Sequence, residues 1–387
     1  MTELWIWLAG RPGLGPVKLR ALLERFGSPK ALYEADSEAL AREGLTPRAQ
    51  CALADKDLRP AQAILHRCRL QGIELLCLSD AAYPSALRQT PDAPPVLYCL
   101  GRLPVSGQQP WIGLVGARQA DSRGLRLAYE MSREIAGCGG VVVTGMAKGV
   151  DAEAARGALD QGGAVVGVLG GGVDVVYPAE NAGLYARVRQ QGCLVSEYPP
   201  GVQPNARHFP ARNRIISGLS DGVAVVQAAE HSGALITARW AAEQGREVFS
   251  VPGPAGEALS RGCNRLLREG AILAESGWDV MREYLCRYPG AVRPFRCGPL
   301  PPAPDAAQPA APAEAAPPPP EPGGGTPIPA SLTPLQRRIV EALQDGPVQL
   351  DALIDRLGLP AAQVLPQLTL LQVKQIITQK PGKVYAL

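Results

Sequence analysis

The residues best suited to chemistry are two arginines and an asparagine between Phe209 and Ser220, in the run Phe-Pro-Ala-Arg-Asn-Arg-Ile-Ile-Ser-Gly-Leu-Ser. No aspartate or glutamate occurs from Tyr198 to Ser220, so no carboxylate nearby in the sequence compensates Arg212 and Arg214. The apolar residues that follow predict a short helix, whose N-terminus would present free backbone N–H groups. Guanidinium groups beside such an end suit phosphate. The run predicts a phosphate site, and the alternative is an exposed loop leading into a core helix.

The overall charge does not by itself indicate a polyanionic partner. The chain of 387 residues carries a formal net charge of +3, and residues 111–282 hold 17 basic against 17 acidic side chains. Any site for a polyanion must therefore come from local clustering of charge. With 46% hydrophobic residues the chain can bury packed cores, and its length predicts two or three domains.

The cysteines and the N-terminus indicate a cytoplasmic protein. The nine cysteines include no Cys-x-x-Cys pair, and the three histidines lie apart from any cysteine cluster, so no metal site is predicted. Reduced thiols fit the cytosol. The apolar run Leu4–Ala9 is too short for a signal peptide or a membrane span. We expect a soluble, cytoplasmic protein without membrane contact.

The central part of the chain has the pattern of an α/β domain. From Trp111 onward, short β-branched runs alternate with amphipathic helices, which predicts a Rossmann-like, doubly wound and mainly parallel sheet covered on both faces. The expected strands are Trp111–Val115, Val141–Thr144, Val165–Leu169, Cys193–Ser196, Val223–Gln227, Glu247–Val251 and Ile272–Ala274. In such sheets ligands bind at the carboxyl ends of the strands.

Cationic side chains follow several of these strands. Arg118 comes after the first strand, Lys148 after the second, and the run with Arg212 and Arg214 after the fourth. If the strand order brings these loops together, they form one phosphate-binding crevice. The alternative is that each cation pairs with a nearby carboxylate. No G-x-G-x-x-G motif and no Walker A lysine is present, so no cofactor is predicted.

Composition divides the chain into four parts. Residues 299–330 contain 13 prolines and nine alanines without any lysine or arginine, which predicts a tether between folded units. We expect a mainly helical N-terminal domain over residues 1–100, the α/β core over 101–298, this linker, and a small domain over 331–387.

Both flanking domains leave two interpretations open. The stretch Pro12–Leu23, with two glycines and a following lysine, is typical of a helix-hairpin-helix turn that approaches phosphate, or its glycines merely end helices. In the tail, three helices and a hairpin predict a winged helix, with Thr333 as the cap of the first. The third helix, Ala361–Leu371, has no charged residue, which favours protein contact or packing over reading DNA bases.

Taken together, the central segments resemble the DprA/Smf family, the DNA-processing protein A of bacterial natural transformation. The resemblance covers about residues 110–280. The flanks are similar as well, since the family has a SAM-like or helix-hairpin-helix N-terminal domain and a winged-helix tail. The stretches that carry it are Val115–Arg118, Gly145–Asp151, Ser196–Pro199, Phe209–Ser220, Ser232–Ala238 and Gly262–Asn264.

This resemblance implies a function and a set of site residues. Proteins of the family bind single-stranded DNA in a basic pocket on the Rossmann-like domain, dimerise, and load the recombinase RecA onto DNA that single-strand-binding protein would otherwise cover. The expected partners are therefore single-stranded DNA, RecA, single-strand-binding protein and a second copy of the chain. No catalytic residue is implied. The DNA-binding candidates are Arg118, Lys148, Arg212, Asn213, Arg214, Ser217 and Thr237.

The chain departs from the family pattern at two positions, and one alternative function fits the same central fold. Ala155 stands where the family usually has histidine, and Gln227 where it usually has glutamate; both are expected beside the crevice. The rival is a hydrolase similar to the lysine-decarboxylase-like phosphoribohydrolases, which cleave nucleoside monophosphates. Their characteristic glutamate is missing from the corresponding stretch Ser232–Trp240, which favours binding over hydrolysis.

Overall fold

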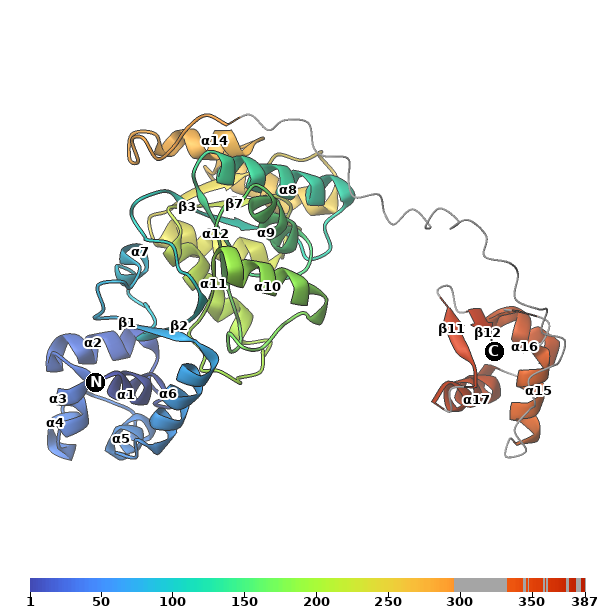
Figure 1. The fold of residues 1–387 in the computed structure, drawn as a ribbon, viewed down its shortest axis with the longest axis horizontal. Helices are drawn as coiled ribbons and strands as arrows, with labels where there is room; N and C mark the ends of the chain where they lie inside the picture. The colour runs from blue at the N-terminus through green and yellow to red at the C-terminus, as the bar shows by residue number, and fades with distance from the viewer. Residues whose placement is uncertain are drawn as a thin grey trace. The chain divides into compact units, whose positions relative to one another are not determined.

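The chain folds into two units, residues 1–301 and 302–387, each described here by itself (Figure 1). The computed structural model describes residues 1–295 and 333–386, apart from 344–345, 347, 358, 360, 374–375 and 381–383. The linker expected over 299–330 lies outside the described residues.

A nine-stranded sheet forms the centre of the first unit, which confirms the α/β fold. The strand order is β1-β2-β6-β5-β4-β3-β7-β8-β9, parallel from β6 to β9, with β2 antiparallel to β6 and β1 antiparallel to β2. The strands are β1 (Glu74–Cys77), β2 (Val96–Gly101), β3 (Trp111–Val115), β4 (Val141–Thr144), β5 (Val165–Val168), β6 (Cys193–Ser196), β7 (Gly222–Val225), β8 (Glu247–Ser250) and β9 (Ile272–Leu273).

Strands β1 and β2 come from the segment that we expected to be mainly helical. Tyr98 of β2 lies opposite Ser196 of β6, so this antiparallel pair of strands extends the sheet of the following domain. The sequence pattern did not reveal it, because a short apolar run such as Val96–Leu100 fits a strand or a buried helix equally well.

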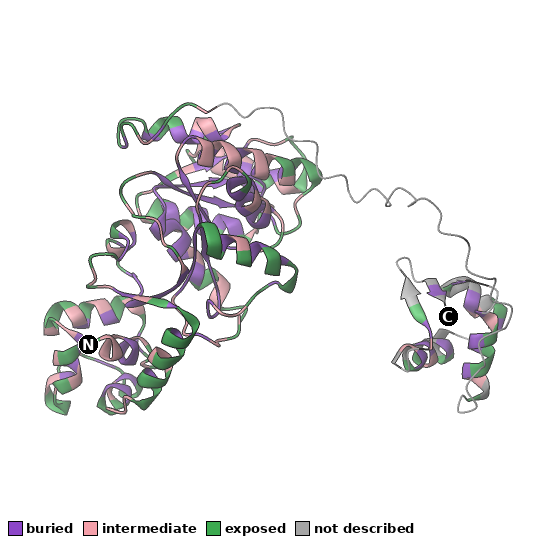
Figure 2. Ribbon diagram, viewed as in Figure 1, coloured by how far each residue is buried: buried purple, intermediate pink, exposed green. Residues whose placement is uncertain are grey.

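Helices cover both faces of the sheet, as Figure 2 shows by the buried strands between them. Alternate residues of β3 enter two separate apolar clusters, Ile112 and Leu114 in one, and Trp111 and Val115 in the other. The first cluster is covered by α8 (Ser122–Gly137), α9 (Val150–Asp160), α10 (Ala182–Gln191) and α14 (Gly277–Met281). The second is covered by α7 (Ser85–Arg88), α11 (His208–Leu219), α12 (Gly233–Glu243) and α13 (Arg261–Arg268).

Six helices precede the sheet and gather at one end of the first unit (Figure 1). They pack on their own apolar cluster around Trp7. In the suggested helix-hairpin-helix turn, Gly13 has a φ of +83° and Lys18 Nζ donates to the Glu43 carbonyl, 3.0 Å away, so this lysine joins two turns of the same domain. The helices are α1 (Thr2–Ala9), α2 (Pro16–Phe26), α3 (Pro29–Glu34), α4 (Ser37–Ala41), α5 (Pro47–Ala54) and α6 (Arg59–Gln71).

The second unit confirms the winged-helix prediction. Thr333 caps the first helix, and its side chain and that of Gln336 exchange hydrogen bonds with each other's backbone. Gln367, on the third helix, accepts a hydrogen bond from Gln336 Nε2 at 2.9 Å. The elements are α15 (Pro334–Ala342), β10 (Val348–Gln349), α16 (Leu350–Leu357), α17 (Ala361–Val373), β11 (Thr378–Lys380) and β12 (Val384–Ala386).

Among the helices of the described residues, none is both long enough and apolar enough to cross a membrane.

Candidate nucleic-acid interface

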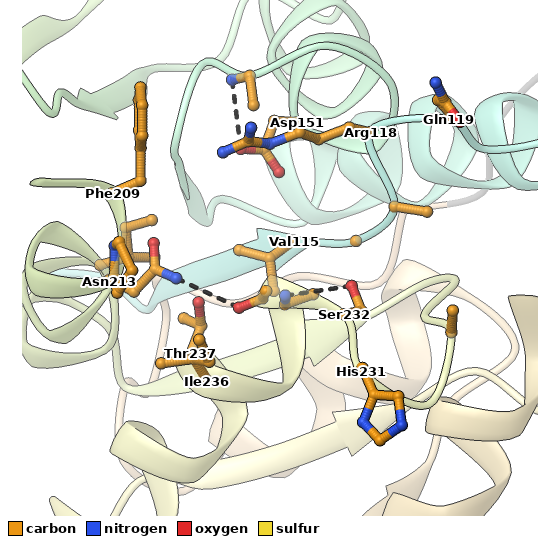
Figure 3. A pocket seen from close by; sticks show the side chains of 18 of the residues that line it. Val115, Arg118, Gln119, Asp151, Phe209, Asn213, His231, Ser232, Ile236 and Thr237 are labelled. Carbon is orange, nitrogen blue, oxygen red and sulfur yellow. Dashed lines mark hydrogen bonds between the residues drawn. The ribbon is translucent and has the colours of Figure 1, made fainter. Parts of the chain in front are cut away.

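A cavity of about 1040 Å³ opens at the carboxyl ends of the parallel strands (Figure 3). It lies between the loop after β3 and the loop after β7, where the strand order changes direction. Such switch points leave a crevice, because the helices following the two strands lie on opposite faces of the sheet. The lining comes from residues 115–119, from most of 229–237, and from the first turns of α11. It holds Arg118, Arg212 and Arg261 against Asp151 and Glu230, a surplus of one positive charge.

Arg118 is one of two exposed arginines in the lining of this cavity, together with Arg261. Its guanidinium lies 5.1 Å from the centre of the Phe209 ring, a cation–π distance, and Figure 3 shows the side chain reaching over the cavity. No carboxylate in the described part of the chain forms an ion pair with it. Its loop packs closely on Gly149, whose φ is +75° and where a Cβ would come within 2.3 Å of the Ala117 carbonyl oxygen. Arg118 is therefore free to bind an external anion.

Arg212 lies at the bottom of the cavity and is buried. Its Nη1 donates to the Gly145 carbonyl at 2.7 Å and to the Val168 carbonyl, at the ends of β4 and β5. Asp151 is also buried there and accepts a hydrogen bond from Ala147 N at 3.3 Å. Burial lowers the pKa of Arg212 and raises that of Asp151, while each charge opposes the shift of the other. Both side chains belong to the lining of the cavity.

The structure does not bring Arg214 to this cavity. Its Nη2 donates to Glu197 at 2.6 Å and its Nε lies 3.4 Å from Asp92, in a side chain that is only 7% exposed. We expected both arginines in a loop before a helix, but α11 begins at His208, so both lie within it. Residues two apart on a helix point in opposite directions. Only Arg212 therefore lines the cavity, and Arg214 anchors α11 to two carboxylates behind it.

Asn213 and Thr237 also line the cavity, on its α11 and α12 sides. Asn213 Nδ2 donates to the Gly233 carbonyl at 3.2 Å, which connects the two helices. Helix α12 begins here, and Ser232 caps it by accepting from Ala234 N. A helix start of this kind favours negative charge in front of it.

Two further candidates are placed away from the cavity. Lys148 is exposed and pairs with Glu180, its Nζ 2.6 Å from Oε2, and it does not belong to the lining. Ser217 is fully buried, and its hydroxyl donates back to the carbonyls of Asn213 and Arg214 within α11. Both residues satisfy their polar groups within the protein.

The lining includes residues that the sequence did not single out. Arg261, at the start of α13, forms no ion pair in the described chain. Tyr177 is 48% exposed and its ring lies 5.5 Å from that of Phe209. His231 and Ile236 are exposed at the start of α12. The sequence could have indicated Arg261 only as a basic residue that follows the sixth expected strand. Such arginines are common, so this position alone does not predict a site.

The two departures from the family pattern were expected beside the crevice, but neither lines it. Ala155 is fully buried in α9 within the apolar cluster. Gln227 accepts from Asp121 N and donates to Asp121 Oδ1 at 2.9 Å, at the cap of α8. An amide suits this place, because a glutamate would set two carboxylates against each other. Within the described residues, no three His, Cys, Asp or Glu side chains are grouped so that they could hold a metal ion.

Known protein families match the chain in two separate segments. Residues 74–285 match the family model of DNA recombination-mediator protein A, and residues 301–383 match that of the DprA winged helix domain. The chain belongs to the DprA/Smf family. Protein Smf of Synechocystis is 33% identical, with 99% of this chain and 98% of that protein aligned. The family to which this chain belongs is one of DNA-processing proteins.

Two solved structures resemble the first unit. DNA processing protein A from Streptococcus pneumoniae superposes with a TM-score of 0.65 at 33% identity, covering 73% of this chain and 98% of that one. The Helicobacter pylori protein, whose structure is described as showing a single-stranded DNA binding mode, gives a TM-score of 0.51 at 28% identity. It covers 56% of this chain and 97% of that one.

Proposed function

We propose that this protein binds single-stranded DNA in the cavity at the carboxyl ends of the strands, during natural transformation and recombination. The observation that carries the proposal is the free guanidinium of Arg118, held over the Phe209 ring at the mouth of a cavity with Arg212 at its base. Charge-assisted hydrogen bonds from guanidinium groups suit phosphate. The single-stranded DNA binding mode described for the Helicobacter pylori relative supports this ligand.

The lining favours single strands over duplex. Unpaired bases can stack on the exposed ring of Tyr177, on the half-buried ring of Phe209 and against the exposed side chain of Ile236. Bases inside a duplex are already stacked and would not reach them. Stacking accepts any base, and we therefore expect little sequence preference.

We propose binding without catalytic turnover. Asp151, the carboxylate at the bottom of the cavity, accepts a backbone hydrogen bond and lies beside Arg212, which suits it to orienting the arginine. Hydrolysis would need a positioned base or an activated nucleophile. Release of free base from nucleoside monophosphates, followed by chromatography and abolished by Asp151→Asn, would contradict this part.

The proposed partners beyond DNA are RecA, single-strand-binding protein and a second copy of the chain. The family description as a recombination mediator supports a RecA loader that protects incoming DNA. For the homodimer, β9 is one of the two edge strands of the sheet and carries Leu273, which is 50% exposed. Light scattering tests the dimer. RecA filament growth on DNA already coated with single-strand-binding protein tests the loading.

Fluorescence anisotropy of the full-length protein tests the DNA proposal directly. A labelled single-stranded oligonucleotide and its duplex are titrated over a series of salt concentrations. We expect tighter binding to the single strand, and a log–log salt slope of about −0.7 for each phosphate neutralised. A preference for duplex, or an affinity independent of salt, would contradict the proposal.

A further inference from the structure

Arg261 lines the large cavity on the wall formed by the loop after β7 and the start of α13. Its side chain is exposed, and it forms no ion pair with any carboxylate of the described chain. The nearest carboxylate along the chain is that of Glu257, which lies 2.6 Å from Arg123 Nη2 and is neutralised there. The charge of Arg261 is therefore available to a ligand.

The main chain around Arg261 is fixed to the loops that follow β7 and β8. Gly262 N donates to the Ala228 carbonyl at 2.8 Å, and a Cβ at Gly262 would come within 2.7 Å of that oxygen, so only glycine allows this approach. The Asn264 side chain exchanges two hydrogen bonds with the Gly253 backbone, at 2.8 and 3.1 Å. A cation on such a fixed backbone loses less conformational freedom when it binds a ligand.

Arg118 and Arg261 reach the cavity from different strands. Arg118 follows β3 and Arg261 follows β8, with β7 between them, so their positions differ by two strand spacings, or about 10 Å. The Arg118 guanidinium is turned toward the Phe209 ring on the α11 wall. Figure 3 shows Arg118 and Phe209 on one side of Val115, and His231, from the loop after β7, on the other. The two arginines therefore face different parts of a ligand that fills the cavity.

We propose that Arg261 contacts a second phosphate of the DNA strand whose first phosphate binds Arg118. This inference rests on the proposed binding of single-stranded DNA, and it makes the ligand a chain of linked nucleotides that crosses the ends of β3, β7 and β8. A guanidinium group suits phosphate because its planar fork donates to two oxygens at once.

Glu230 is the carboxylate that opposes a phosphate on this wall. It is exposed and forms no ion pair in the described chain, so it does not neutralise Arg261 by contact. At the base of the cavity Arg212 and Asp151 balance each other, which leaves Arg118 and Arg261 against Glu230 alone. Phosphate is therefore still attracted, and Glu230→Gln should strengthen binding to single strands. Weaker binding in this variant would overturn the assignment.

Fluorescence anisotropy with a single-stranded oligonucleotide, over a series of salt concentrations, tests the contact in the full-length protein. Arg261→Met keeps the apolar stem and should weaken binding about tenfold, or about 1.4 kcal/mol. It should also flatten the log–log salt slope by about 0.7. The melting temperature should stay near that of the wild type, because the side chain is exposed and unpaired.

The matched control is Arg102→Met, which also removes an exposed arginine without an ion pair in the part of the chain that the structure describes. Arg102 follows β2, which runs antiparallel to β6, so it lies at the opposite edge of the sheet from the cavity. This variant should bind normally. Unchanged affinity in Arg261→Met, or equal losses in both variants, would overturn the proposal.

The double variant Arg118→Ala/Arg261→Met distinguishes two phosphates from one. If the arginines hold different phosphates, their losses in binding free energy should add and the salt slope should flatten by about 1.4 in all. A double variant that binds as well as Arg118→Ala would place both arginines on one phosphate and overturn the proposal. A loss in Arg118→Ala with none in Arg261→Met would overturn this inference alone, whereas a wild type that does not bind single strands would overturn the DNA proposal as well.

Discussion

The guanidinium of Arg118 lies 5.1 Å from the centre of the Phe209 ring, at the mouth of the larger cavity. The two residues come from the loop after β3 and from the first turn of α11, more than 90 positions apart in the chain. Because no carboxylate of the described chain pairs with this guanidinium, its charge is available to a ligand. The ring holds it in place without neutralising it.

Replacing Arg118 with alanine should weaken single-stranded DNA about ten- to hundredfold. A charge-assisted contact contributes roughly 1.5–3 kcal/mol. Arg118→Lys should recover only part of the loss, since an ammonium cannot form the bidentate fork. Fluorescence anisotropy titrations measure the affinity of the wild type and of both variants for single-stranded DNA. The matched control is Arg126→Ala on α8, which removes an exposed arginine paired with Glu130 and should bind normally. Equal losses in both variants would indicate only a general effect of charge.

Arg212 and Arg214 should separate into two roles. Arg214→Ala leaves Glu197 and Asp92 buried without their cation, and breaking a buried pair costs about 3–5 kcal/mol. We expect a melting temperature lower by about 5–8 °C, with the affinity of the folded protein for DNA near wild type. Arg212→Ala should lower both, because it removes a cavity cation and two hydrogen bonds to the strand ends.

Melting temperature and affinity are measured on the same two variants. Arg214→Ala would contradict this division if it lost as much DNA affinity as Arg212→Ala without a lower melting temperature. Arg214 would then belong to the DNA-binding surface. Glu197→Gln should reproduce the stability loss of Arg214→Ala in part, because it removes one of the two charges that Arg214 neutralises.

Stability should fall in alkali because of buried thiols. Burial raises the pKa of Cys68 from 9.0 to about 11 and that of Cys77 to about 12. Between pH 9 and these raised pKa values, the thiols of the unfolded chain have released their protons while those of the folded chain still hold them. The free energy of unfolding therefore decreases as pH rises. Urea unfolding should show a loss of about 2 kcal/mol or more between pH 8 and 10.5. Cys68→Ala should reduce this slope and Cys51→Ala, at an exposed cysteine, should not.

The winged helix should be dispensable for binding single strands. Residues 1–301 form a unit of their own, and the described residues of the tail have a separate apolar core. A protein ending at Gly298 should remain folded and bind within about tenfold of the full chain, or about 1.4 kcal/mol. Circular dichroism and anisotropy check this. A larger loss of affinity in a well-folded truncated protein would make the tail part of the DNA site.

The sequence by itself determined where the central strands lie along the chain and that they run parallel, but not their order in the sheet. Strand β3 begins and ends where its apolar run does, because a buried parallel strand needs apolar residues on both faces. Parallel strands place their following loops at one edge, so the position of Arg118 at the cavity could be predicted. The cap at Thr333 also followed from local chemistry, since it depends only on the residues of the first turn.

Only the tertiary structure decided which way the arginines of α11 point. The helix begins at His208, and two positions on a helix reverse the direction of a side chain, so Arg214 lies behind the cavity with Asp92 as a partner. Asp92 is more than 100 residues from Arg214 in the sequence, so the residues around Arg214 could not predict this contact.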